Sequence, residues 1–170
     1  MEAIFKAGKA KAIGVSHYCK HHMEDILAIA EVKPAVNQVQ FHVGMGPAPA
    51  NATDDKPWDA TVGVHFESFS PLCGPCTTPD GKKDMSLITG PLVTGIGAKY
   101  NVSGVQVSLR WLVQQGIPVI PKTDRKEHLI ENADLFSWSL SDEDMAALSA
   151  AKTPAVAGVS PSDSGDCGLP

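Results

Sequence analysis

Short apolar stretches alternate with helix-forming stretches about four times along this chain, and this alternation limits the fold more than any other feature. The expected strands are 12–16, 35–42, 64–72 and 117–120. The expected helices are 1–8, 21–32, 87–100 with an interruption at Gly90-Pro91, 103–115, 124–132 and a last one that begins at Ser141. Because parallel strands need a crossover connection, strands separated by helices favour parallel pairing. The order therefore predicts an α/β fold with a parallel sheet.

Two segments depart from the alternation. Residues 43–63 carry glycines and prolines that break a helix, so we expect about one helical turn there, near Trp58. Residues 153–170 are rich in Pro, Gly, Ser and Asp, a composition typical of a mobile segment. We therefore expect one folded domain over 1–152 and a flexible tail over 153–170.

The composition fits one folded domain and excludes some classes of function. A net charge of −5 over 170 residues argues against a general nucleic-acid-binding or polybasic membrane-binding surface. No apolar run is long enough to cross a bilayer, and the first residues do not form a signal peptide. We therefore expect a cytoplasmic protein whose four cysteines are reduced.

The turn between the last expected strand and its helix carries a group of charged and hydroxyl side chains. Asp124 is a candidate N-cap, with Glu127 at the capping-box spacing. Lys122, Thr123 and Arg125 lie beside it, next to the backbone N–H groups and the positive end of the helix dipole. Such a site suits a phosphate group. The alternative is an ordinary turn with solvated charges.

The strand over 35–42 alternates between two kinds of side chain. One face carries the polar side chains Gln38, Gln40 and His42, and the other carries Asn37, Val39 and Phe41. Polar groups near the carboxyl end of a strand suit a barrel active site. A strand with one face in water explains the same pattern.

Two other groups of residues are candidates for a metal-binding site or a redox site. His17, His21 and His22 lack a further ligand at a suitable spacing, so we expect no metal there. Cys73 and Cys76 have the C-x-x-C spacing of a redox dithiol or of half a zinc site. A second cysteine pair is absent and a turn-forming sequence follows, which favours a plain loop with two thiols.

Several stretches, in order, resemble motifs of the aldo-keto reductase family. They are Gly14-Val-Ser-His-Tyr18, Asn37-Gln-Val-Gln-Phe-His42, Phe69-Ser-Pro-Leu72, Ile96-Gly-Ala-Lys-Tyr-Asn101, Gln106 to Gly116, and Ile120-Pro-Lys-Thr123 with Glu131-Asn132. The resemblance runs from the first of these motifs to about residue 150. It implies a (β/α)8 TIM barrel, of which this chain would carry strands five to eight.

The resemblance also implies a cofactor, NADP(H), and the residues that contact it. The nicotinamide end would involve Ser16, Gln38 and the position of His17, where the family has Asn, while Phe69 stacks on the ring and Ser70 and Leu72 approach the pyrophosphate. The adenosine end would involve Lys122, Thr123, Asp124, Arg125, Glu131 and Asn132. His128 stands where the family usually has Arg, which weakens the expected preference for NADP over NAD.

The resemblance implies reduction of aldehydes and ketones by hydride transfer from NADPH. In the family, a Tyr supported by Lys, Asp and His donates the proton, and all of these belong to the first half of the barrel. Tyr18 and Tyr100 lie in other motifs, so we assign no catalytic residue and no metal. A half-barrel has open sheet edges, so we expect self-association or pairing with an N-terminal half. A non-catalytic nucleotide- or partner-binding half-barrel and a dithiol redox protein are the alternatives.

Overall fold

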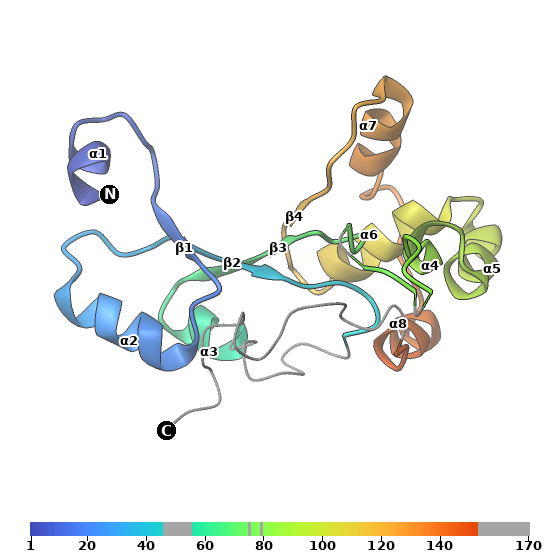
Figure 1. The fold of residues 1–170 in the computed structure, drawn as a ribbon, viewed down its shortest axis with the longest axis horizontal. Coiled ribbons are helices and arrows are strands. Elements are labelled where there is room, and N and C mark those ends of the chain that lie inside the picture. Colours follow the sequence, from blue (N-terminus) through green and yellow to red (C-terminus); the bar gives the residue numbers. More distant parts are fainter. Residues whose placement is uncertain (46–55, 75, 79, 153–170) are drawn as a thin grey trace. The chain divides into compact units, whose positions relative to one another are not determined.

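The computed structural model describes residues 1–45, 56–74, 76–78 and 80–152 (Figure 1). The expected tail, 153–170, lies outside the described residues. The chain divides into two compact units, which we describe separately. Unit 1 contains 1–39 and 48–67, and unit 2 contains 40–47 and 68–158, each within the described ranges.

The strands form a parallel sheet, as the alternation predicts. They are β1 (Gly14–Ser16), β2 (Val36–Gln40), β3 (His65–Phe69) and β4 (Val119–Ile120), in the order β1-β2-β3-β4. In unit 1, Val15 of β1 pairs with Asn37 of β2. In unit 2, Ser68 of β3 pairs with Val119 of β4. Each strand is shorter than its apolar stretch in the sequence.

The described residues of unit 1 contain three helices: α1 (Glu2–Lys6), α2 (Lys20–Ile29) and α3 (Lys56–Thr61). The carboxylate of Glu2 accepts hydrogen bonds from the backbone N–H groups of Glu31 and Val32, which ties α1 to the segment after α2. The side-chain amide of the buried Asn37 donates to the carbonyl of Tyr18 and to the carboxylate of Asp59 on α3. The short helical segment expected near Trp58 is present as α3.

Where the structure describes unit 2, it has five helices: α4 (Ser86–Thr89), α5 (Pro91–Tyr100), α6 (Gly104–Gln114), α7 (Lys126–Ala133) and α8 (Asp142–Ser149). The helix expected over 87–100 divides into α4 and α5 at Gly90-Pro91. Proline cannot donate a backbone hydrogen bond, but it is well tolerated at the first position of a helix. α6 starts with the complete capping box of Ser103 and Gln106 that the sequence predicts.

The core of unit 2 is built around Trp111 of α6, which is fully buried. Its ring stacks on Phe41, with centroids 5.4 Å apart. The indole N–H, which needs an acceptor when buried, donates to the hydroxyl of Ser149 on α8 at 3.1 Å. Trp111 therefore joins α6, α8 and the segment after β2 in one core.

The start of α7 differs from the prediction. Its N-cap is Arg125 and not Asp124, and no side chain of the described part of the chain caps it. The hydroxyl of Thr123 accepts the hydrogen bond from the N–H of Arg125 at 3.2 Å. This local turn delays the helix until Lys126, so Glu127 is too early for the capping-box position.

None of the described helices combines the length and the apolar composition needed to cross a bilayer.

Candidate functional site

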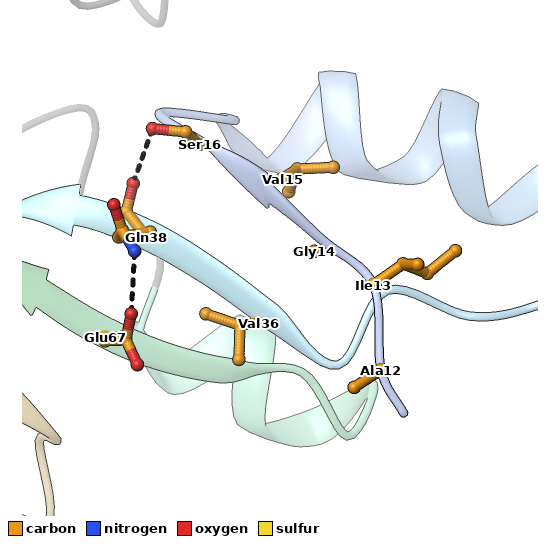
Figure 2. A pocket seen from close by; sticks show the side chains of 8 residues that line it. All are labelled: Ala12, Ile13, Gly14, Val15, Ser16, Val36, Gln38 and Glu67. Carbon is orange, nitrogen blue, oxygen red and sulfur yellow. Dashed lines mark hydrogen bonds between the residues drawn. The ribbon is translucent and has the colours of Figure 1, made fainter. Parts of the chain in front are cut away.

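A pocket of about 410 Å3 lies in unit 1 beside β1, β2 and β3 (Figure 2). Its polar groups come from Ser16, Gln38 and Glu67. The hydroxyl of Ser16 donates to the backbone carbonyl of Gln38 at 3.1 Å, and the amide of Gln38 donates to the carboxylate of Glu67 at 2.8 Å. Ser16 and Gln38, which the resemblance places at the nicotinamide end, therefore lie together.

His17 has a left-handed backbone conformation, with a φ of 56°. Histidine and asparagine are among the few non-glycine residues that adopt this conformation at low cost. The backbone N–H of His17 donates to the same carbonyl of Gln38 that Ser16 contacts, at 3.0 Å. Partial burial lowers the pKa of the His17 imidazole, which favours its neutral form at neutral pH.

Glu67 is a polar residue of this pocket that the sequence analysis missed. It lies in the middle of β3, two positions before Phe69, so both side chains point to the same face of the strand. The available signal was a single carboxylate in a strand with Phe at positions 66 and 69. Its bond to Gln38 fixes the amide so that the amide oxygen is left for a hydrogen-bond donor such as a carboxamide N–H2.

In unit 2, Phe69, Ser70 and Leu72 lie at the carboxyl end of β3, and all three are half-buried. Ser70 has a φ of 48°, and its carbonyl accepts a hydrogen bond from the N–H of Cys73 at 2.8 Å. This turn brings the chain out of the strand and fixes the loop after it. Left-handed conformations of non-glycine residues are costly and cluster at ligand sites.

The predicted phosphate-binding residues follow β4 in unit 2. Lys122, Asp124, Arg125 and His128 are exposed, and Thr123 is half-buried by its turn. Within the described ranges, Lys122 and Arg125 take part in no ion pair. Their positive charges therefore lie beside the uncapped N-terminus of α7 and are available to an anion.

Glu131 and Asn132 lie one to two turns further along α7 and are half-buried. Asn132 borders an open pocket of about 480 Å3, which is lined by residues of β4, α7 and the end of α6 together with Phe136. Its side-chain oxygen is buried and has no hydrogen-bond partner in the part of the chain that the structure describes. A buried acceptor without a donor is costly, so it suits a ligand that brings an N–H group, such as the amino group of adenine.

The structure corrects the expectation of reduced cysteines, because Cys19, Cys73 and Cys76 are each disulfide-bonded. Cys73 and Cys76 form a disulfide, and their Cα atoms are 5.3 Å apart. That separation lies within the usual range for a disulfide, so the tight turn itself permits the bond. The turn-forming sequence after it is present too, with Thr77 bridged to Lys83, and the next helix begins only at Ser86.

A Tyr, a Lys and an Asp meet elsewhere in unit 2, but they stabilise a helix end. Lys99 and the hydroxyl of Tyr100 both donate to the carboxylate of Asp144, each at 2.6 Å. Asp144 lies in the first turn of α8, and Ser141 is the N-cap of that helix. These bonds hold the pKa of Asp144 below its ordinary value, with Lys99 as the largest cause. The group is therefore a capping network, and we assign none of its members to catalysis.

The sequence is similar to one protein family and to several known proteins. The model of the aldo/keto reductase family matches residues 1–153. Glyoxal reductase of Bacillus subtilis is 37% identical over 150 residues, which are 88% of this chain and 49% of that protein. Morphine 6-dehydrogenase of Pseudomonas putida is 32% identical over 165 residues, which are 95% of this chain and 54% of that protein.

Solved structures resemble the fold as well. The aldose reductase of Schistosoma japonicum superposes with a TM-score of 0.72 at 28% sequence identity, over 88% of this chain and 44% of that one. The enzyme MGS-M4, an aldo-keto reductase from a deep-sea metagenome library, superposes with a TM-score of 0.70. The chain therefore spans about half the length of the proteins that it matches.

Proposed function

Because this chain belongs to the aldo/keto reductase family, we propose that it carries the cofactor-binding half of an NADPH-dependent carbonyl reductase. The observation that carries the proposal is the start of α7, where two cationic side chains and the helix N-terminus have no ion-pair or capping side-chain partner among the described residues. The family resemblance gives this anion site its ligand, the 2′-phosphate of NADPH. In this proposal, the chain supplies strands five to eight of the barrel.

Charged groups and hydrogen-bond donors at the start of α7 support the binding of the 2′-phosphate of NADPH there. Lys122 offers a compact positive charge and Arg125 a planar fork of N–H groups that matches two phosphate oxygens. The first N–H groups of α7 point out of the helix start and add donors. His128 would add at most one charge, and only when protonated. Asn132 and Glu131 would then face the adenine ring.

The expected contacts of the nicotinamide carboxamide follow from the pocket of unit 1, and the expected stacking residue, which lies in unit 2, follows from the family resemblance. Ser16 and the amide oxygen of Gln38 would contact the carboxamide, and Glu67 would hold Gln38 in place. The half-buried ring of Phe69 offers a flat apolar surface for stacking. When bound, NADPH would supply the hydride for a carbonyl carbon, while this chain orients the ring that carries it.

The proton donor would come from a partner, the catalytic half of a family barrel. Unit 2 exposes large apolar side chains on β4, α7 and the turn after it: Ile120, Leu129, Ile130 and Phe136. Phe136 is 75% exposed and Leu129 is 63% exposed. Exposed apolar groups of this size favour a partner that covers them. The carbonyl substrate would be a small aldehyde or ketone, and the complete protein would work in the cytoplasm.

A non-catalytic half-barrel that binds a nucleotide or a protein partner is the second candidate. The same α7 site and the same exposed apolar groups support it, since neither requires a proton donor. Supplying the first half of a family barrel in trans separates the two candidates. Carbonyl-dependent oxidation of NADPH would favour the reductase, and cofactor binding without turnover would favour the non-catalytic protein.

Titration of the purified chain with NADPH, followed by fluorescence, tests the proposal directly. Size-exclusion chromatography of the same sample shows whether the binding species is folded and of defined size. We expect saturable binding, and weaker binding of NADH in calorimetry because NADH lacks the 2′-phosphate. Equal affinities for the two cofactors would refute the phosphate site, and a folded chain without binding would refute the cofactor-binding role.

A further inference from the structure

Three ligating side chains of unit 2 meet in a cluster that the proposed function does not use. His42 follows β2, and Cys73 and Cys76 lie in the loop after β3. Their donor atoms all lie within 4.8 Å of one another. His42 and Cys73 are fully buried and Cys76 is 1% exposed, while Gly74 between the cysteines is exposed. The loop therefore lies at the surface and directs both sulfur atoms inward.

The hydrogen bonds of His42 fix which of its ring nitrogens can act as a ligand. Nδ1 lies 2.7 Å from the backbone carbonyl oxygen of Val43, and a carbonyl oxygen can only accept. Nδ1 therefore carries the hydrogen, and Nε2 keeps a free lone pair. Nε2 faces the sulfur of Cys76 at 3.8 Å. A metal-binding histidine typically has this arrangement, with its second ring nitrogen held by a backbone carbonyl.

We propose that Cys73, Cys76 and His42 bind one zinc-class divalent cation when the two thiols are reduced, and that the disulfide is the metal-free state of the same site. Thiolate and imidazole are the ligands that Zn²⁺ prefers. Three protein ligands leave a fourth position for water, as in many three-ligand zinc sites. The site therefore differs from the structural four-cysteine site that the sequence could not complete.

The distances fit a tetrahedral ion. Bond lengths of about 2.3 Å to sulfur and about 2.0 Å to nitrogen place neighbouring donors roughly 3.5–4 Å apart. The separation of 3.8 Å between Nε2 and Cys76 already lies in this range. Reduction frees the two sulfur atoms to move apart within a turn whose Cα atoms are 5.3 Å apart. The hydroxyl of Ser68 bonds to the carbonyl of Phe41 at 2.6 Å and holds the two chain segments together beside the site.

The environment of Cys73 and Cys76 favours a metal-binding role for the two cysteines over the role of a redox-active dithiol. The N–H of Asp84 donates to the carbonyl of Cys76 at 2.9 Å and holds the loop in place beside the cluster. A reactive dithiol needs an accessible thiolate, usually at a helix N-terminus. Here both sulfur atoms are buried, and the next helix, α4, begins only at Ser86.

The two states interconvert by balanced steps. A reductant supplies two electrons and the solvent two protons, the S–S bond breaks, and two thiols form. Binding of Zn²⁺ then releases two thiol protons to the solvent and forms bonds to both sulfur atoms and to Nε2 of His42. In the reverse direction, a small-molecule disulfide accepts two electrons and becomes two thiols, while Cys73 and Cys76 form their S–S bond. This oxidation removes two of the three protein ligands, so it releases Zn²⁺ to the solvent.

Titration of the complete chain with Co²⁺, a coloured probe for zinc sites, tests the proposal. The chain is first reduced with a phosphine, which is removed in the absence of oxygen. We expect one equivalent of Co²⁺ to give thiolate-to-metal charge-transfer absorption, and Zn²⁺ to displace it. The untreated, oxidised chain should give no such absorption. A reduced, folded chain that gives none would overturn the proposal.

Variants identify the ligands. Cys73→Ser, Cys76→Ser and His42→Gln should each weaken Co²⁺ binding at least tenfold, whereas Cys19→Ser, which removes a cysteine outside the cluster, should leave it unchanged. Unchanged binding in folded His42→Gln would overturn the three-ligand site.

For variants that fail to fold, alkylation of the reduced wild-type chain replaces the comparison. Zn²⁺ should slow the alkylation of Cys73 and Cys76 at least tenfold by mass spectrometry, and equal rates would overturn the proposal.

Discussion

At the residue scale, the start of α7 provides the sharpest test of the cofactor site. Lys122→Ala and Arg125→Ala each remove a charge that has no ion-pair partner in the described ranges. A hydrogen bond to a charged group contributes about 1.5–3 kcal/mol, so each change should weaken NADPH binding roughly tenfold or more. Binding of NADH should change little, because it lacks the phosphate.

Lys11→Ala provides the matched control for these two variants. Lys11 is exposed and lies in unit 1, so its removal changes the net charge equally without touching the α7 site. Calorimetry with both cofactors measures all three variants. Equal loss of NADPH binding in Lys11→Ala would mean that the effect is general electrostatic attraction and not a phosphate site.

His17 gives a second prediction at this scale, based on its backbone. A β-branched residue is strained at a φ of 56°, so His17→Val should lower the free energy of unfolding by about 1–2 kcal/mol. His17→Asn should be nearly neutral, because asparagine tolerates this conformation. Urea denaturation of both variants measures the difference. If both variants lose the same stability, the lost contacts of the imidazole, and not the backbone conformation, set the cost.

At the element scale, the acid side of the stability profile depends on the first turn of α8. The pKa of Asp144 is held below its ordinary value of 3.8 by Lys99 and Tyr100. A carboxylate with a lowered pKa contributes stability that is complete above its ordinary value and is lost as the pH falls through the lowered one. Asp144→Asn should therefore flatten the loss of stability below about pH 4.

Asp142→Asn is the control for this pH dependence. Asp142 lies in the same first turn of α8 and is exposed. Thermal melts between pH 2 and pH 7 compare the two variants with the original chain. If Asp142→Asn flattens the profile as much as Asp144→Asn does, general repulsion in the helix, and not the network with Lys99 and Tyr100, explains the acid loss.

The elements that the sequence predicts correctly are those with a local physical cause. Ser103 caps α6 and Ser141 caps α8, since the hydroxyl and the backbone N–H groups that it contacts lie within one turn. The start of α7 was predicted incorrectly because Thr123 competes with Asp124 for the nearby N–H groups, and both are good partners. Glu67 was missed because its contact with Gln38 depends on which strand lies opposite, which local patterns do not contain. The disulfide between Cys73 and Cys76 is local, and it was not predicted because the absence of a visible signal peptide led us to expect reduced thiols.

For the candidate sites too, some contacts were predicted from the sequence and others were not. The motifs predict that Ser16, His17 and Gln38 belong together, and hydrogen bonds link all three in unit 1. The contact between His42 and Cys76 was not predicted, because the two residues are 34 positions apart in the sequence. Only the parallel order of β2 and β3 brings the ends of those strands to the same edge of the sheet.

At the scale of the whole molecule, the proposed partner half predicts how the isolated chain behaves in solution. The exposed apolar side chains of unit 2, Leu129 and Phe136 among them, would be covered in a complete barrel. In the isolated chain they face water, at a cost of roughly 1.5–3 kcal/mol for each large side chain. The chain should therefore self-associate as its concentration rises, which light scattering after size-exclusion chromatography measures.

The double variant Leu129→Gln and Phe136→Gln should shift this association to at least tenfold higher concentration, because two of the largest exposed apolar groups become polar. Ile29→Gln is the control, since Ile29 is 78% exposed but lies in unit 1. If both changes reduce association equally, contact between chains is non-specific. A loss confined to the double variant would mean that one surface carries the association, and the same variant should then also weaken binding of the catalytic half of a family barrel.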